Sequence, residues 1–247
     1  MWASGIVAYR RNKMNITKNL TTINRTILQN RKIEYIVIHY FGGLASAKST
    51  CAYFRNINRK ASAHYFVDDG GVWQCVEDAD ASWHCGDGGK GTFKGQCTNA
   101  NSIGIEVRPF KVDASRAAYV GDTDWYFHEQ TVTNLIELVK SLMEKHGIDA
   151  EHVIRHYDVT VKVCPRPWVG EDINTYYGKT GNDLWTEFKR GLEGKSMTEP
   201  IPAWKAEIAD KSIANGVIAD STWKNKLDEP APVWMVLAIA NKIKEGK

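Results

Sequence analysis

The sequence predicts an α/β protein with a mixed central β-sheet flanked by helices, plus a small helical C-terminal module. Short apolar segments typical of strands alternate with segments whose apolar residues recur at helical spacing, which is the pattern of a sheet covered by helices. Asp69-Gly70-Gly71 separates two of the strand-like segments and suits a hairpin turn. The chain has 247 residues, 43% of them hydrophobic and 25% charged, which is enough to bury a sizeable core.

Strands are predicted where short segments are rich in β-branched and aromatic residues. These segments are 35–40, 64–68, 72–77, 102–108 and 152–155. Along the fourth of them, Ile103, Ile105 and Val107 should occupy one face of the strand and Glu106 the other. A glutamate in such a run is seldom buried without a partner, so Glu106 belongs either to a structural ion pair or to a catalytic site.

Helices are predicted where apolar residues recur every three or four positions. These segments are 49–58, 128–146 and 184–192. The first should bury Cys51, Phe54 and Ile57 on one face, and Gly147 should end the second. The polar, glycine-rich stretch 84–101 is expected to line a groove rather than to fill a core.

Three residues form the predicted metal site, namely His39, His156 and Cys164. His39 closes an apolar strand, and the other two are eight residues apart. Imidazole and thiolate are ligands that Zn²⁺ prefers, and three protein ligands leave its fourth position open, as in catalytic zinc sites. Because Pro165 favours an extended backbone before it, Lys162 and Cys164 should point the same way, which places a cation beside the metal. The other histidines, taken singly, are explained more simply as hydrogen-bonding residues.

Six separated segments carry further motifs, in a fixed order along the chain. They are Tyr35–His39, Ser62–Asp68, Trp83–Gly88, Asn101–Glu106, Arg155–Asp158 and Lys162–Pro165. Together they resemble the zinc-dependent N-acetylmuramoyl-L-alanine amidases, a family that shares its fold with peptidoglycan recognition proteins and phage lysozyme-type amidases. The resemblance covers about residues 14 to 193 and implies a phage or prophage endolysin.

The resemblance implies a role for each site residue. His39, His156 and Cys164 match the three zinc ligands of the family. Glu106 matches the glutamate that activates the zinc-bound water, and Lys162 matches the lysine that steadies charge on the reacting carbonyl oxygen. Some relatives have aspartate in place of the cysteine, and peptidoglycan recognition proteins that only bind typically lack this third ligand.

Substrate-binding residues are implied as well. His64 and Tyr65 match positions where the family places a histidine or tyrosine near the metal, and either of them could face the site. Trp83 and His84 belong to the segment Trp83–Gly88, which matches a loop that usually borders the substrate groove.

The implied reaction is hydrolysis of the amide bond between N-acetylmuramic acid and L-alanine of peptidoglycan, which gives cell-wall lysis. The residue chemistry agrees, because Zn²⁺ lowers the pKa of its water to about 7. Glu106 can pass a proton from that water to the departing amine, and Lys162 can help to stabilise the oxyanion. The alternatives are a non-catalytic peptidoglycan-binding protein of the same fold and a domain whose zinc is purely structural.

The chain is expected to have four parts. Residues 1–13 are an N-terminal extension, 14–193 the zinc amidase domain, 194–201 a linker and 202–247 a small helical module. This module is similar to a surface-layer-homology-type unit, which implies wall binding or self-association into a homo-oligomer. Its apolar stripe could equally pack on the amidase domain.

Charge and hydropathy patterns limit the binding partners that can be expected for this protein. Residues 1–34 carry a net charge of +6 in a chain of net charge +3, so this arm either binds anionic wall polymers or lipid head groups or is a solvated leader. Aromatic and basic residues do not interleave as they do in nucleic-acid platforms, so no nucleic-acid partner is expected. No transmembrane segment and no signal peptide are evident. We expect synthesis in the cytoplasm and action on the bacterial cell wall after release.

The five cysteines are an odd number without a secretory signal, which argues against a disulfide framework. Cys51 and Cys75 lie in apolar patterns and are expected in the core. Cys85 and Cys97 could pair across their glycine-rich loop, but free thiols are favoured.

Overall fold

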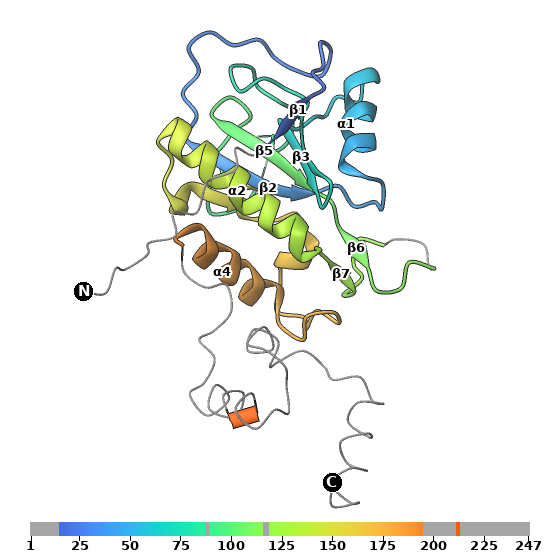
Figure 1. Ribbon diagram of the computed structural model, residues 1–247. Helices are drawn as coiled ribbons and strands as arrows, with labels where there is room; N and C mark the ends of the chain where they lie inside the picture. Colours follow the sequence, from blue (N-terminus) through green and yellow to red (C-terminus); the bar gives the residue numbers. More distant parts are fainter. Residues whose placement is uncertain (1–14, 87–88, 116–118, 195–210, 213–247) are drawn as a thin grey trace, which may run out of the picture. The chain divides into compact units, whose positions relative to one another are not determined.

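A computed structural model describes residues 15–86, 89–115, 119–194 and 211–212. In this part of the chain six strands form one sheet in the order β1-β4-β3-β5-β2-β8 (Figure 1). The strands are β1 (Ile16–Lys18), β2 (Tyr35–Tyr40), β3 (Tyr65–Asp68), β4 (Gly71–Gln74), β5 (Ser102–Val107) and β8 (Val153–Arg155). Strands β3 and β4 pair antiparallel as the predicted hairpin, and the other neighbours pair parallel. The predicted mixed sheet is therefore confirmed.

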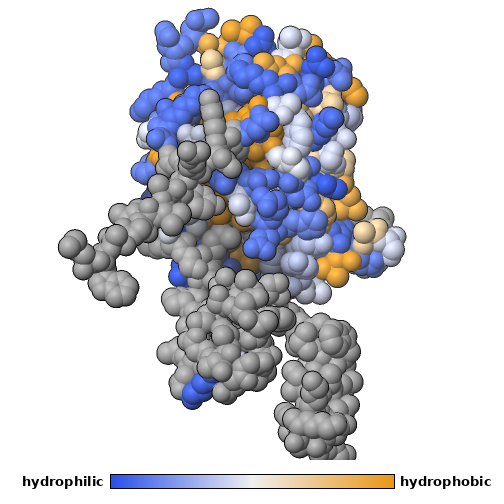
Figure 2. Space-filling view, in the orientation of Figure 1, coloured by the Kyte–Doolittle hydropathy of each residue, from blue (hydrophilic) through white to orange (hydrophobic). Residues whose placement is uncertain are grey.

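The described residues also form four α-helices, two 3₁₀ turns and a two-stranded ribbon. They are α1 (Ala47–Asn56), α2 (Glu129–His146), α3 (His156–Thr160), α4 (Gly181–Leu192), η1 (Ala150–His152), η2 (Arg166–Trp168), β6 (Phe110–Lys111) and β7 (Trp125–Tyr126). Helix α2 crosses one face of the sheet with α4 beside it (Figure 1). The same face of the molecule is largely hydrophilic at its surface, with scattered hydrophobic patches (Figure 2).

The main hydrophobic core lies between the sheet and helices α2 and α4. Alternate residues of β2 and β5 point into it, and the apolar stripes of the two helices cover them. Its fully buried members include Ile36, Ile38, Ile103, Ile105, Leu135, Leu138 and Val139. Because side chains alternate along a strand, the residues between them, including His39 and Glu106, belong to the opposite face.

The opposite face of the sheet is covered by α1 and by the described residues of the stretch 84–101. Cys51 of α1 packs with Phe66 and Cys75, as expected for core cysteines. Cys85 and Cys97 pack with Val37 and are 4% and 0% exposed. The expectation that this loop only lines a groove is therefore wrong for these two residues. The structure describes all five cysteines as buried free thiols.

Helix boundaries follow the local capping residues. The side chain of Ser46 accepts a hydrogen bond from the backbone N–H of Ser49, so α1 begins two residues before the predicted start. Thr180 and Asp183 form a capping box that starts α4 three residues early. Gly147 ends α2 in the left-handed conformation, φ 67°, as predicted.

The prediction that Ile57 shares the buried face of α1 is wrong. The helix ends at Asn56, and Ile57 is its extended C-cap, 43% exposed. Its position in the sequence matched the apolar spacing, but the helix does not reach it.

The chain divides into two compact units, Met1–Met197 and Thr198–Lys247. The predicted extension 1–13, nearly all of the linker 194–201 and nearly all of the helical module 202–247 lie outside the described residues. Among the residues that are described, no helix has the length and apolar character needed to cross a bilayer.

Candidate metal centre

Neighbouring parallel strands bring His39 and His156 together. Strand β2 lies between β5 and β8, and its Ile38 pairs with Arg155 of β8. His39 and His156, the next residue of each segment, therefore emerge side by side where β2 nears its end and α3 begins. Their ring centroids are 4.5 Å apart. The carboxyl ends of parallel strands thus supply two of the three predicted ligands.

Cys164 completes the cluster from the coil that follows α3. One ligand atom from each of His39, His156 and Cys164 lies within 4.8 Å of the others, and all three residues are buried. The Cys164 Sγ atom is 3.9 Å from Nδ1 of His39. A tetrahedral zinc with ordinary bond lengths would hold such a nitrogen and sulfur about 3.6 Å apart. The buried Nδ1 atom of His156 has no hydrogen-bond partner among the described residues. The donor set and its spacing therefore fit a zinc ion.

The two histidines are ready to bind a cation, whereas the thiol must first lose its proton. Burial lowers the pKa of His39 well below its ordinary value, and it lowers the pKa of His156 to about 4. Both imidazoles are therefore neutral near pH 7 and can offer a lone pair. Burial raises the pKa of the Cys164 thiol, and the nearby Glu106 raises it further. A bound cation would have to displace the thiol proton, which couples metal affinity to pH.

Glu106 lies beside this cluster because it is the register partner of His39 across β2 and β5. It is half-buried, and its Oε2 atom is buried without a hydrogen-bond partner among the described residues. Burial raises the pKa of Glu106 to about 7, although the positive charge of Lys162 acts in the opposite direction. The carboxyl group is therefore poised to exchange a proton near neutral pH.

Lys162 borders the cluster from the surface. The sequence predicted that it would point the same way as Cys164, but Lys162 is exposed whereas Cys164 is buried. The backbone just before it is not extended, since Val161 adopts a left-handed conformation with φ 58°. Its charge still acts on both histidines, lowering their pKa values. Lys162 therefore stands close enough to influence chemistry at the cluster.

His64 and Tyr65 are held in the interior. His64 is fully buried, and its ring nitrogens contact the Ser82 hydroxyl at 2.7 Å and the carbonyl oxygen of Asp80 at 3.0 Å. Tyr65 is 3% exposed and donates a hydrogen bond of 2.6 Å to Asp78. This placement does not support the expectation that one of them contacts a substrate, because the polar atoms of both side chains already have partners inside the protein.

Trp83 and His84 differ in their surroundings. Trp83 is half-buried and donates its indole N–H to Thr26 at the surface. His84 instead contacts His39, with 3.0 Å between its Nδ1 atom and Nε2 of His39. The Nε2 atom of His84 forms a hydrogen bond with the Ser102 hydroxyl. Ser102 was not among the site residues predicted from the sequence. The glycine at position 104, inside a strand, was the one available signal of a close approach to β5.

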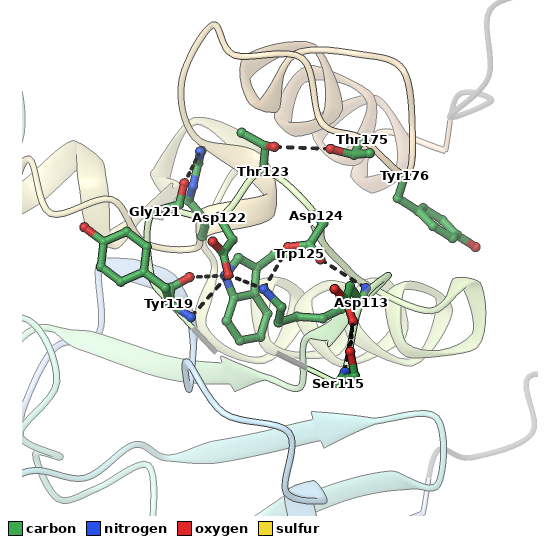
Figure 3. A network of polar contacts seen from close by, with 12 residues as sticks. Asp113, Ser115, Tyr119, Gly121, Asp122, Thr123, Asp124, Trp125, Thr175 and Tyr176 are labelled. Carbon is green, nitrogen blue, oxygen red and sulfur yellow. Dashed lines mark hydrogen bonds and ion pairs between the residues drawn. The ribbon is translucent and has the colours of Figure 1, made fainter. Parts of the chain in front are cut away.

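A separate cavity of about 480 Å³ lies beside the β6–β7 ribbon and holds several carboxylates (Figure 3). Asp122 and Asp124 bind the buried amino group of Lys111, and Asp124 also accepts from the backbone N–H of Asp113. The cavity lining includes none of the predicted metal ligands. Because these acidic groups serve the ribbon itself, we assign the cavity no ligand.

Comparison with known proteins places the chain in a family. The sequence profile of N-acetylmuramoyl-L-alanine amidase matches residues 29–167. The amidase CwlL of Bacillus licheniformis is 32% identical over 214 residues, which cover 83% of this chain and 54% of that protein. The amidase XlyA of Bacillus subtilis (strain 168) is 29% identical over 201 residues, 79% of this chain and 57% of XlyA. The chain spans about half the length of these curated relatives.

Solved structures agree with the sequence relatives. The catalytic domain of XlyA, at 26% identity, superposes with a TM-score of 0.52 and covers 72% of this chain and 99% of its own. The structure of PlyL, at 23% identity, gives a TM-score of 0.55 over 75% of this chain and all of its own, and it supports the fold alone. The profile match covers more than half of the chain and includes five of the six strands of the described sheet and all three clustered residues. By sequence, this protein belongs to the N-acetylmuramoyl-L-alanine amidase family.

Proposed function

We propose that the protein hydrolyses the amide bond between N-acetylmuramic acid and L-alanine of peptidoglycan, with Zn²⁺ held by His39, His156 and Cys164. The observation that carries the proposal is the buried cluster of two imidazoles and one thiol, whose ligand atoms lie within 4.8 Å of one another. Family membership supports the choice of bond, because the relatives are named for this activity. Peptidoglycan is therefore the proposed partner, and the bacterial cell wall the proposed place of action.

Glu106, Lys162 and the three zinc ligands each have a distinct role in the proposed reaction. When bound, zinc would supply a Lewis acid that makes water a nucleophile near neutral pH. Glu106 takes a proton from the attacking water and passes it to the departing amine, and its pKa of about 7 suits both transfers. Lys162 adds positive charge where the carbonyl oxygen becomes negative. Burial of the three ligands excludes competing water from their polar atoms.

The deciding experiment compares two serine substitutions of buried cysteines. Cys164→Ser should abolish zinc binding and the release of stem peptides from purified cell walls. Cys51→Ser makes the same chemical change at a buried cysteine packed with Phe66, outside the cluster, and should keep both. Zinc content is measured by elemental analysis, and released peptides are identified by mass spectrometry through a new amino terminus on L-alanine.

Two outcomes would contradict the proposal. Full hydrolysis by a Cys164→Ser variant with a normal zinc content would remove Cys164 from the ligand set. A zinc-loaded wild-type protein that binds walls but releases no peptide would instead support a non-catalytic peptidoglycan-binding protein of the same fold.

A further inference from the structure

His84 contacts the metal cluster through one of its proposed ligands. The Nδ1 atom of His84 lies 3.0 Å from Nε2 of His39, and the Nε2 atom of His84 lies 3.1 Å from the hydroxyl oxygen of Ser102. The two imidazole rings meet edge to face, with centroids 5.1 Å apart. Both ring nitrogens of His84 are therefore used inside the protein rather than turned to a substrate.

The contacts decide which nitrogen of each neutral imidazole carries the proton. His39 directs Nδ1 towards Cys164, so this nitrogen is the one that offers a lone pair to a metal. A neutral imidazole that does so carries its proton on Nε2, and His39 must therefore donate to Nδ1 of His84. His84 then carries its own proton on Nε2 and donates it to Ser102. The Ser102 hydroxyl donates onward to the carbonyl oxygen of Thr98.

Strand β5 is built to accept the His84 ring. Its residues Ser102, Gly104 and Glu106 alternate along the strand and share the face that carries the cluster. A Cβ atom at Gly104 would lie 2.5 Å from Cγ of His84, too close for any other residue without displacing the ring. The backbone N–H of His84 is also fixed, because it donates to the side chain of Asn99 at 3.0 Å. The ring contacts, the backbone hydrogen bond and the close fit against β5 together hold His84 in one orientation.

We propose that His84 is a positioning residue that orients His39 for metal binding through the chain His39–His84–Ser102. It acts through His39 and touches neither metal nor substrate. The inference rests on the proposed zinc site. It adds His84 as the hydrogen-bond partner of the His39 Nε2 atom, which is not the nitrogen directed at the metal. Such partners fix the tautomer and the ring orientation of a ligand, and their loss typically weakens metal affinity about 10- to 100-fold.

The test measures zinc affinity of the full-length protein by competition with a chromophoric chelator. His84→Ala should weaken zinc binding about 10- to 100-fold. His84→Asn places an amide oxygen where Nδ1 lay and should restore most of the affinity, whereas the longer His84→Gln cannot accept at that point and should not. His152→Ala, at a surface histidine paired with Asp149, is the matched control and should bind zinc as the wild type does.

Thermal unfolding of the metal-free variants separates positioning from general damage. A positioning role requires that His84→Asn and His84→Gln differ in zinc affinity while their metal-free melting temperatures agree. Equal zinc affinities in these two variants would overturn the proposal, and so would a His84→Ala protein with wild-type affinity. This comparison holds even if His84→Ala does not fold.

The test also distinguishes this inference from the proposed function. Wild-type protein that binds zinc and releases no peptide would overturn the amidase activity and leave the role of His84 intact. Active wild-type protein whose His84 variants all bind zinc normally would overturn the role of His84 alone.

Discussion

Glu106 and His39 are neighbours because β5 and β2 pair in parallel with these two residues in register. The same strand pairing leaves the Oε2 atom of Glu106 buried and without a partner among the described residues. A buried carboxylate that makes no ion pair is costly to keep for stability alone. The sequence left two explanations open for Glu106, a structural ion pair and a catalytic carboxylate. This environment favours the catalytic carboxylate.

Glu106→Gln should therefore reduce hydrolysis while the protein still binds zinc. The amide has nearly the same shape but cannot accept the proton of the attacking water, so we expect kcat to fall about 10²- to 10⁴-fold. The matched control is Glu77→Gln, which removes a carboxylate that pairs with Lys18 at the surface and should leave kcat as in the wild type. Steady-state kinetics and zinc analysis of both proteins check this, and a Glu106→Gln protein with wild-type kcat would exclude Glu106 as the base.

Asp78 joins two elements, strand β3 and helix α2. It accepts hydrogen bonds from Tyr65 of β3 at 2.6 Å, from Lys145 at 2.7 Å and from His146 at 2.9 Å, the last two at the end of α2. Burial pushes the pKa of Asp78 upward, but these hydrogen bonds outweigh it and hold the pKa below its ordinary value of 3.8. Asp78 therefore stabilises the fold more strongly in its ionised form than in its protonated form.

Asp78→Asn should lower the free energy of unfolding by about 2 kcal/mol at pH 7, because buried donors lose a charged acceptor. A carboxyl group whose folded pKa is depressed contributes fully above its unfolded pKa, and the contribution is lost as the pH falls through the folded pKa. The difference between wild type and variant should therefore shrink below about pH 3.8. Urea unfolding at several pH values checks this. Asp172→Asn, at a carboxylate 73% exposed, is the control, and a pH-independent difference for Asp78→Asn would contradict the assignment.

Sequence patterns predicted the long elements and missed several of the short ones, because a short element shows too little of its period. Helix α2 has five turns of apolar spacing and a glycine after its last residue. Its type and its C-terminal end were therefore both predicted correctly. The ribbon strands β6 and β7 have two residues each, which is too few to show any period. Helix α3 has five residues, and its N-cap is Arg155, a residue type that does not predict a helix start.

In the candidate site, too, some features could be predicted from the sequence and others could not. His39, His156 and Cys164 were found because their side chains have few other uses in this combination. The contact between His84 and His39 could not be predicted, because 45 residues separate them and only the sheet brings them together. The burial of His64 and Tyr65 likewise depends on the register of β3, which a single sequence does not fix.

The main core lies apart from the two histidines of the proposed metal site, and this arrangement decides how the protein should respond to metal removal. The main core lies between the sheet and helices α2 and α4, whereas His39 and Glu106 belong to the other face of the sheet. The apolar core contains Cys164 but neither histidine of the cluster. Zinc would therefore add stability to a fold that already has its own core, which is the arrangement of a catalytic metal rather than a structural one.

Chelation should abolish peptide release while the protein stays folded. We expect the far-ultraviolet circular dichroism of the metal-free protein to match that of the zinc-loaded protein and its unfolding to remain cooperative. Returning zinc at about 100 times its Kd should stabilise the fold by about 2.7 kcal/mol, because zinc binds only the native arrangement of ligands. Parallel measurements of dichroism, melting temperature and hydrolysis check this. Loss of the dichroism signal on chelation would mean that the ion holds the fold together, and the structural zinc domain would replace the amidase as the best account of the cluster.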